Sequence, residues 1–234
     1  MINCEWGVEG VRKYSPGSEI TIIIDVLSFS TCVDVALSRN ALVYPYKYKD
    51  ESAIEYAKDN NAVLASFKRS KEELSLSPQS LMNIKEGTKI ILPSPNGAEL
   101  SLNTYSNITI TACLRNYKIV ADYVNSINGN IAVIPAGEKW QNGSIRFAIE
   151  DYLGVGALIS VLNGELSAES FAAKKYFEAF ESELKDVIIN SYSGKELIEK
   201  GFSEDLEIAL DMFSGNSIPV LKEKCFVNSV NITI

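Results

Sequence analysis

A carboxylate and three hydroxyl side chains follow a strongly apolar run near the start of this 234-residue chain. The run begins at Ile20 and ends at Asp25, and the hydroxyls belong to Ser28, Ser30 and Thr31. A carboxylate at such a position can hold a cation, and hydroxyls beside the first N–H groups of a helix can hold an anion. The same residues can instead cap the helix or shape a turn, so both interpretations of this segment stay open.

Four further polar residues stand after other apolar runs, namely Asn96, Arg115, Asn116 and Glu138. If these runs are parallel strands, their carboxyl ends meet at one edge of a sheet and the polar side chains form a pocket there. Carboxylates suit Mg²⁺, which prefers oxygen ligands, and Arg115 suits bidentate binding of phosphate, sulfonate or carboxylate. The pattern favours an enzyme that acts on a small, multiply anionic molecule.

Glu150 and Asp151 open a largely apolar segment that is typical of a buried helix. Acidic residues in the first turn of a helix usually interact with the helix dipole. The alternative is that one or both of them complete a metal site with Asp25 and Glu138. Both interpretations are kept for this pair, whereas Glu204 and Asp205 are interpreted as an ordinary helix start.

The absence of histidine removes several kinds of catalytic site. Ser-His-Asp and Cys-His nucleophile systems are excluded in their usual form, and so is phosphohistidine chemistry. Hydrolysis must then use carboxylates, a metal ion, Lys, Tyr or Cys. The four cysteines are widely spaced without a CxxC pair, so neither a zinc site nor a disulfide framework is predicted.

The composition limits which classes of binding partner and which cellular location are expected. The net charge of −8 argues against a nucleic-acid surface, which needs clustered Lys and Arg. No stretch approaches the roughly 20 apolar residues of a membrane-spanning helix, so no membrane partner is expected. The N-terminus lacks the basic and then apolar pattern of a signal peptide, and a cytoplasmic location is the expectation.

The apolar runs predict strands that alternate with helices. This order predicts a single domain over 1–234, with a three-layer α/β/α architecture and a mostly parallel central sheet. A polar segment over 67–86 is predicted to be a long loop with a helical turn. Strands are predicted at 20–27, 41–46, 62–66, 89–94, 108–114 and 130–138, with a short edge strand and a loop within 1–19 and extended structure over 218–232. Helices are predicted near 31–39, 50–60, 117–127, 145–163, 167–190, 194–200 and 203–212, with a further one after the turn at 95–98.

Seven motifs in order resemble the 2-phosphosulfolactate phosphatase family. They are IDVLSFST at 24–31, LSPQS at 76–80, PNGA at 95–98, ACLRN at 112–116, PAGEKW at 135–140, EDYLGVGA at 150–157 and GFSED at 201–205. The resemblance covers nearly the whole chain. It departs from the family pattern at Ser28, where the family often has Arg, and at 66–68, where it often has Gly-Glu-Arg.

The resemblance implies an α/β/α enzyme that uses Mg²⁺ to hydrolyse (R)-2-phospho-3-sulfolactate to 3-sulfolactate and phosphate, in a pathway that leads to coenzyme M. Our hypothesis for the mechanism is that Asp25, Glu138 and one or both of Glu150 and Asp151 hold the ion directly or through water. Residues Ser28, Ser30, Thr31 and Asn96 would donate to phosphate oxygens, and Arg115 and Asn116 would hold the sulfonate or carboxylate end.

Several alternatives remain open at this point. The attacking group is water, Asp25 or the thiol of Cys32, with direct attack by water slightly favoured. The competing classes are a protein that binds small anions without catalysis, a phosphatase of another phosphorylated hydroxy acid, and a lyase on a phosphorylated acid. A homodimer is a plausible assembly for a small α/β enzyme.

Overall fold

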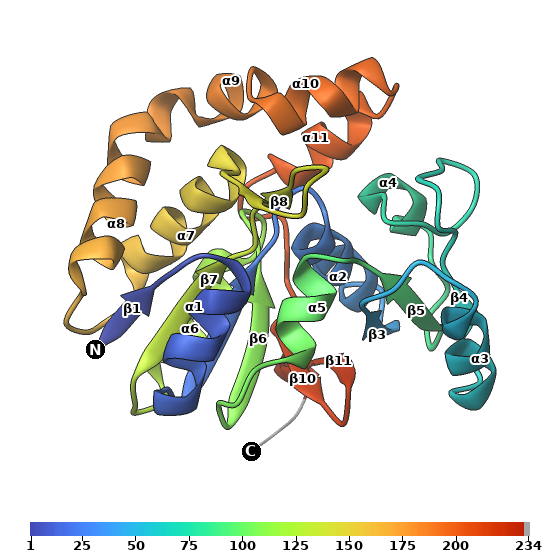
Figure 1. The fold of residues 1–234 in the computed structure, drawn as a ribbon, viewed down its shortest axis with the longest axis horizontal. Helices are drawn as coiled ribbons and strands as arrows, with labels where there is room; N and C mark the ends of the chain where they lie inside the picture. Colours follow the sequence, from blue (N-terminus) through green and yellow to red (C-terminus); the bar gives the residue numbers. More distant parts are fainter. Residues whose placement is uncertain (232–234) are drawn as a thin grey trace.

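A nine-stranded sheet forms the centre of the computed structural model, which describes residues 1–231 (Figure 1). Its strand order is β1-β7-β2-β6-β10-β11-β3-β5-β4. The strands are β1 (Ile2–Cys4), β2 (Ile20–Ile24), β3 (Leu42–Tyr46), β4 (Val63–Leu64), β5 (Lys89–Pro93), β6 (Ile108–Ala112), β7 (Ile131–Pro135), β10 (Pro219–Lys222) and β11 (Cys225–Asn228). A separate two-stranded hairpin pairs β8 (Glu138–Lys139) with β9 (Ile145–Arg146).

Helices cover both faces of the sheet. They are α1 (Gly7–Tyr14), α2 (Phe29–Leu37), α3 (Ser52–Asp59), α4 (Pro78–Leu81), α5 (Gly97–Leu102), α6 (Tyr117–Asn125), α7 (Ile149–Val161), α8 (Ala168–Phe180), α9 (Leu184–Ile189), α10 (Tyr192–Glu199) and α11 (Ser203–Ala209), with short 3₁₀ turns at Ser15–Gly17, Glu181–Glu183 and Ser229–Asn231. Helices α8 to α11 form an arch along the left and top of Figure 1. The layers confirm the predicted α/β class.

The sheet consists of two parallel groups joined by an antiparallel hairpin. Strands β1, β7, β2 and β6 pair in parallel, as do β3, β5 and β4. The hairpin of β10 and β11 lies between β6 and β3 and pairs antiparallel with both. The prediction of a mostly parallel sheet is therefore confirmed. Residues 218–228, predicted to be extended, supply the two central strands that join its halves. Residues 232–234 of the predicted extended segment lie outside the described part.

Strand β2 is buried on both faces because it lies between β6 and β7. Ile22 and Ile24 pack into the core that α6 and α7 share with the sheet. Ile23, between them in the sequence, points to the other face, where Val11 of α1 and Leu100 of α5 cover it. Successive side chains of a strand point to opposite faces, and both faces of β2 are covered. All five residues of β2 are therefore buried.

Three segments differ from the prediction. Helix α1 occupies part of the region predicted as a loop. Its Gly10 lies against the Glu5 carbonyl, where an added Cβ would be 2.4 Å from the oxygen. The β8–β9 hairpin precedes α7, which begins at Ile149 instead of 145. The long helix predicted over 167–190 is divided at Glu181–Glu183. Within residues 1–231, no helix is both long and apolar enough to cross a membrane.

Helices α7 and α8 pack closely because Gly156 has no side chain. A Cβ at this position would lie 2.3 Å from the Ala173 carbonyl oxygen and 2.6 Å from Cβ of Phe177. Gly156→Ala is expected to lower the free energy of unfolding by about 1–3 kcal/mol, because the added methyl group overpacks a filled interface. The midpoint of urea unfolding measures this effect.

Gly17→Ala is the matched control, because no atom lies within 4 Å of a Cβ built at Gly17. We expect that variant to be neutral or stabilised by less than about 1 kcal/mol. Equal urea midpoints for wild type and Gly156→Ala would contradict the close packing of α7 on α8.

Candidate functional site

A cavity of about 330 Å³ lies at the ends of the central strands. Its lining includes Asp25 after β2, Asn96 after β5 and Glu138 after β7, which the sequence predicted to meet there. Its other lining residues are Leu27, Ser28, Lys49, Arg69, Leu76, Ser94, Pro95, Ser193, Glu196, Leu197 and Lys200. The cavity therefore combines carboxylates, cations and hydroxyls from distant parts of the chain.

The Asp25 carboxylate is fixed by backbone N–H groups of two segments. The N–H of Phe29 donates to Oδ1 at 3.2 Å, and the N–H of Gly97 donates to Oδ2 at 2.8 Å. A Cβ at Gly97 would lie 2.7 Å from Oδ2, so this approach requires glycine. The turn that follows β5 thus brings Asn96 and Gly97 against the turn that follows β2.

Ser30 and Thr31 hold the shape of the turn after β2. Ser30 Oγ accepts a hydrogen bond from the N–H of Asp25 at 2.8 Å and lies 2.6 Å from Thr111 Oγ1. Thr31 Oγ1 donates to the carbonyl of Val26 at 2.7 Å. Both side chains are buried, and neither belongs to the cavity lining, which contains Ser28 instead.

Burial raises the pKa of Asp25 to about 7. The negative charge of Glu138 adds to this rise, and that of Glu150 contributes less, while the N–H groups of Gly97 and Phe29 oppose it. Glu138 Oε1 accepts hydrogen bonds from Asn96 Nδ2 at 2.9 Å and from its neighbour's backbone N–H. These carboxylates are close enough to influence one another, and a divalent cation among them would relieve their repulsion.

Glu150 and Asp151 differ in their surroundings. Burial raises the pKa of both carboxyls. The Asp151 oxygens accept the backbone N–H groups of Val26 at 2.8 Å and Gly137 at 2.9 Å, so this side chain fixes the turns after β2 and β7. Glu150 Oε2 is buried, and residues 1–231 supply it no hydrogen-bond donor. Neither Glu150 nor Asp151 belongs to the lining of the Asp25 cavity, so the orphaned Glu150 oxygen can take part in an ion site there only through water.

A magnesium site here would have to keep much of its water shell. Within the described residues, no three or more His, Cys, Asp or Glu side chains form a group that could hold a metal ion by themselves. Mg²⁺ commonly binds through one or two carboxylates and retains several waters, and a phosphate oxygen of the substrate supplies a further ligand. Asp25 and Glu138 fit that requirement.

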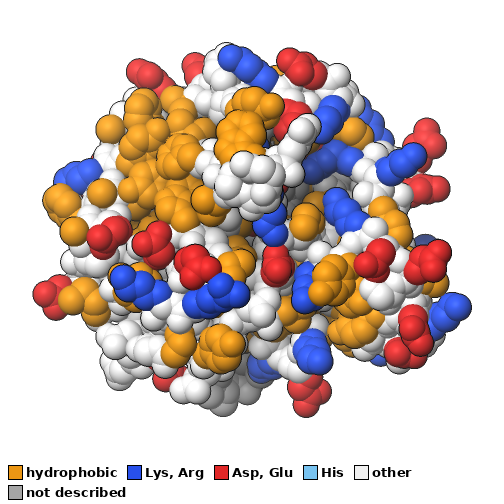
Figure 2. Space-filling model, viewed as in Figure 1, with side chains coloured by type: hydrophobic (Ala, Val, Ile, Leu, Met, Phe, Trp, Pro, Cys, Tyr) orange, Lys and Arg blue, Asp and Glu red, His pale blue; other side chains and the backbone are white. Residues whose placement is uncertain are grey.

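The sequence prediction missed three cations, Lys49, Arg69 and Lys200, that line the cavity. Partial removal of water from around its ammonium group and the positive charge of Arg69 lower the pKa of Lys49, although the residue as a whole is exposed. Arg69 Nη2 donates to Ser28 Oγ at 3.1 Å. Figure 2 shows Lys and Arg side chains gathered around a hollow in the right half of the molecule. Lys49 and Arg69 lie in polar segments some residues beyond the ends of β3 and β4, and Lys200 lies at the end of α10, so the sequence does not single them out.

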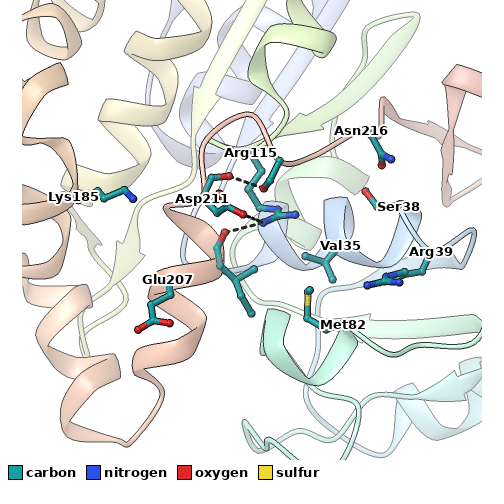
Figure 3. A pocket seen from close by; sticks show the side chains of 11 residues that line it. Val35, Ser38, Arg39, Met82, Arg115, Lys185, Glu207, Asp211 and Asn216 are labelled. Carbon is teal, nitrogen blue, oxygen red and sulfur yellow. Dashed lines mark hydrogen bonds and ion pairs between the residues drawn. The ribbon is translucent and has the colours of Figure 1, made fainter.

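Arg115 lies in a different cavity, of about 660 Å³ (Figure 3). Its Nε donates to Asp34 Oδ2 at 2.8 Å, and its Nη1 donates to the carbonyl of Ile208 at 3.0 Å. Asp34 is fully buried, so its charge balances that of the guanidinium. The structure therefore does not bring Arg115 together with Asp25 and Glu138.

Asn116 also lies outside the lining of the Asp25 cavity. Its Oδ1 accepts the backbone N–H of Cys113 at 2.9 Å, and its Nδ2 donates to the carbonyl of Ser217 at 3.2 Å. Ser217 directly precedes the Ile218 and Pro219 segment that enters β10. In the structure, Asn116 thus ties the end of β6 to the start of the hairpin.

The chain is similar throughout to phosphatases of known name. A family model described as 2-phosphosulpholactate phosphatase matches residues 8–224. The 2-phosphosulfolactate phosphatase of Methanothermobacter thermautotrophicus is 29% identical over 211 residues, which cover 88% of each chain. A probable 2-phosphosulfolactate phosphatase of Carboxydothermus hydrogenoformans is 31% identical, with 80% of this chain and 79% of the relative covered. One of Thermotoga maritima is 30% identical over 88% of this chain and 90% of the relative.

Glu138→Gln is expected to lower the pKa of Asp25 from about 7 toward its ordinary value of 3.8, because it removes a nearby negative charge. The ¹³C chemical shift of the Asp25 carboxyl, followed against pH, measures the change. A raised folded-state pKa means that the contribution of Asp25 to stability is present below pH 3.8 and is lost as the pH rises through about 7. The variant should therefore lose less stability over that interval.

Glu99→Gln is the control, because Glu99 is only partly buried and pairs with Lys139 at 2.9 Å. We expect it to leave the titration of Asp25 unchanged. An unaltered Asp25 titration in Glu138→Gln would show that the charge of Glu138 does not raise this pKa.

Cys32 is unsuited to act as a nucleophile. Its side chain is fully buried, and burial raises the pKa of the thiol well above its ordinary value. Cys32→Ala is expected to retain phosphate release within about threefold of wild type, since a thiolate is the reactive form of cysteine. A variant that is folded by circular dichroism but inactive would restore the thiol to the mechanism.

Proposed function

The chain belongs to the 2-phosphosulpholactate phosphatase family, and from this premise we propose that it is a Mg²⁺-dependent hydrolase of (R)-2-phospho-3-sulfolactate. The family assignment makes it a phosphoric monoester hydrolase. The observation that carries the proposal is the cavity in which Asp25 and Glu138 face Lys49 and Arg69. Phosphoryl transfer depends on positioned charges of both kinds, because the anionic substrate must be neutralised and water must be activated.

The cationic side of the cavity would hold the substrate's anionic groups. Arg69 and Ser28 are joined by a hydrogen bond and line the cavity together, so they form one donor group. Lys49 adds a second positive charge without a carboxylate partner within 4 Å among the described residues. A phosphate ester that carries a second strong acid group matches these two cations better than a simple alkyl phosphate does.

Asp25 and Glu138 would hold Mg²⁺, with Glu150 reaching it through water. The ion would supply Lewis-acid stabilisation of a phosphate oxygen and favour ionisation of water. Asp151 stays outside this set, because it does not line the cavity and, unlike Glu150, has no oxygen without a hydrogen-bond donor. Ser30 and Thr31 support the turn that carries Asp25 instead of donating to the phosphate.

The proton transfers can be assigned to side chains of this cavity. The Asp25 carboxylate would hold the ion through water and not directly, and it would take a proton from the attacking water as the new P–O bond forms. As the ester P–O bond breaks, the leaving alkoxide needs a proton. The Lys49 ammonium would donate it, since a lowered pKa makes it a stronger acid than an ordinary lysine.

Asp25→Asn is expected to reduce phosphate release at least about 100-fold, because the amide cannot accept the proton of water. Release of inorganic phosphate, measured at saturating substrate, tests this. Glu51→Gln is the control, since Glu51 is an exposed acid at the start of α3 and should leave the rate unchanged. Near-normal turnover by Asp25→Asn would remove Asp25 from the mechanism.

A panel of phosphorylated hydroxy acids, with and without a sulfonate or second carboxylate, separates the remaining alternatives. We expect release to be fastest from 2-phospho-3-sulfolactate and to be abolished by EDTA and restored by Mg²⁺. Faster release from another compound would reassign the substrate, and undiminished release in EDTA would reject the metal. Binding without any phosphate release would indicate a protein that senses small anions.

A further inference from the structure

Asp205 is a fully buried carboxylate on α11, and its side chain reaches toward the Phe67–Glu86 segment. Its Oδ1 accepts hydrogen bonds from Ser77 Oγ at 2.6 Å and from the backbone N–H of Gln79 at 3.2 Å. Its Oδ2 accepts one from Nη1 of Arg69. Three donors therefore converge on this carboxylate, far more than a residue that only starts a helix needs.

Arg69 is fixed on both sides of its guanidinium. Nη1 donates to Asp205, and Nη2 donates to Ser28 Oγ at 3.1 Å. The guanidinium also lies 5.6 Å from the centre of the Phe202 ring, at a distance that allows a cation–π contact. These contacts hold one orientation of a long side chain that would otherwise have many.

The direction of this hydrogen-bond chain has a consequence for Ser28. Because Ser28 Oγ accepts from Arg69, the hydroxyl hydrogen of Ser28 is left to donate elsewhere. Ser28 and Arg69 both line the cavity that contains Asp25. The hydroxyl and the remaining guanidinium N–H groups are thus available to one oxyanion.

We propose that Asp205 is a positioning residue, which orients Arg69 and, through Arg69, the Ser28 hydroxyl toward the anionic group of the substrate. This inference rests on the proposed phosphatase function and deepens it. Asp205 does not itself line the cavity, and it reaches the cavity only through Arg69. It acts by preorganising two donors, so that their orientation costs no further entropy when the anion binds.

A neighbouring ion pair provides the contrast. Lys71 Nζ and Glu204 Oε2 lie 2.9 Å apart and join the same loop to the same helix. Their side chains are 41% and 43% exposed, and neither residue lines the cavity. An exposed pair of this kind contributes little to stability and cannot orient a donor in the cavity.

The test compares Asp205→Asn with Glu204→Gln. We expect Asp205→Asn to raise KM and the inhibition constant of inorganic phosphate roughly tenfold, which corresponds to one lost charge-assisted hydrogen bond, with kcat reduced less. Glu204→Gln should change either value by less than about twofold, as expected for an exposed ion pair. An Asp205→Asn protein that binds phosphate as wild type does would overturn the proposal.

A double-variant cycle separates positioning from a merely structural role. If Asp205 acts through Arg69, then Arg69→Ala and the Arg69→Ala, Asp205→Asn double variant should bind phosphate equally weakly. Fully additive losses would mean that Asp205 acts by another route, and the proposal would fail. If Asp205→Asn does not fold, Ser77→Ala removes one of the bonds that hold Asp205 and should weaken phosphate binding in the same direction.

Calorimetric titration with inorganic phosphate keeps this inference distinct from the proposed function. If wild type binds phosphate and the binding depends on Asp205, but no ester is hydrolysed, then the phosphatase proposal fails and the positioning role stands. If wild type hydrolyses esters and the Asp205→Asn variant has unchanged KM and phosphate affinity, the positioning role alone fails. Absence of phosphate binding by wild type would overturn the positioning role.

Discussion

The buried carboxylate of Asp25 is the constraint on which the site depends. A charged group in this position is costly unless donors or a cation compensate it. Two backbone N–H groups, from Phe29 and Gly97, supply part of that compensation and at the same time tie the turn after β2 to the turn after β5. The compensation is incomplete, so burial and the negative charge of Glu138 still raise the pKa of Asp25. The fold thereby keeps an unfavourable buried charge at the place where the proposed chemistry uses it.

The carboxylates and the cations of the cavity come from different parts of the sheet. Asp25 and Glu138 follow β2 and β7, which belong to one parallel group. Lys49 and Arg69 follow β3 and β4, which belong to the other. The site therefore exists only when the two groups are correctly placed relative to each other. Helix α5 contacts both β2 and β3, which belong to different parallel groups. Its first residue, Gly97, donates a backbone hydrogen bond to Asp25. The same helix therefore connects the two groups and positions the carboxylate.

The sequence predicted the parts of the site that follow buried strands. Asp25, Asn96 and Glu138 could be found because apolar runs mark strands, and the carboxyl ends of parallel strands converge. Lys49 and Arg69 could not be found in this way, because a lysine or arginine in a polar loop has the same local sequence whether it faces solvent or a cavity. Arg115 shows the opposite case: it follows a strand as expected, but Asp34, far away in sequence, takes its Nε hydrogen bond. Tertiary pairing of this kind leaves no local signal.

The hairpin of β10 and β11 has a consequence for how the protein is made. It is synthesised after all the other strands, yet it lies in the middle of the sheet and joins the two parallel groups. A nascent chain that has emerged through Lys200 already carries every cavity-lining residue, but it lacks the strands that connect those groups. Early fragments on the ribosome would then expose two unpaired edges, at β6 and β3, until the hairpin arrives. Assembly of the cavity therefore depends on the two strands of the sheet that are synthesised last.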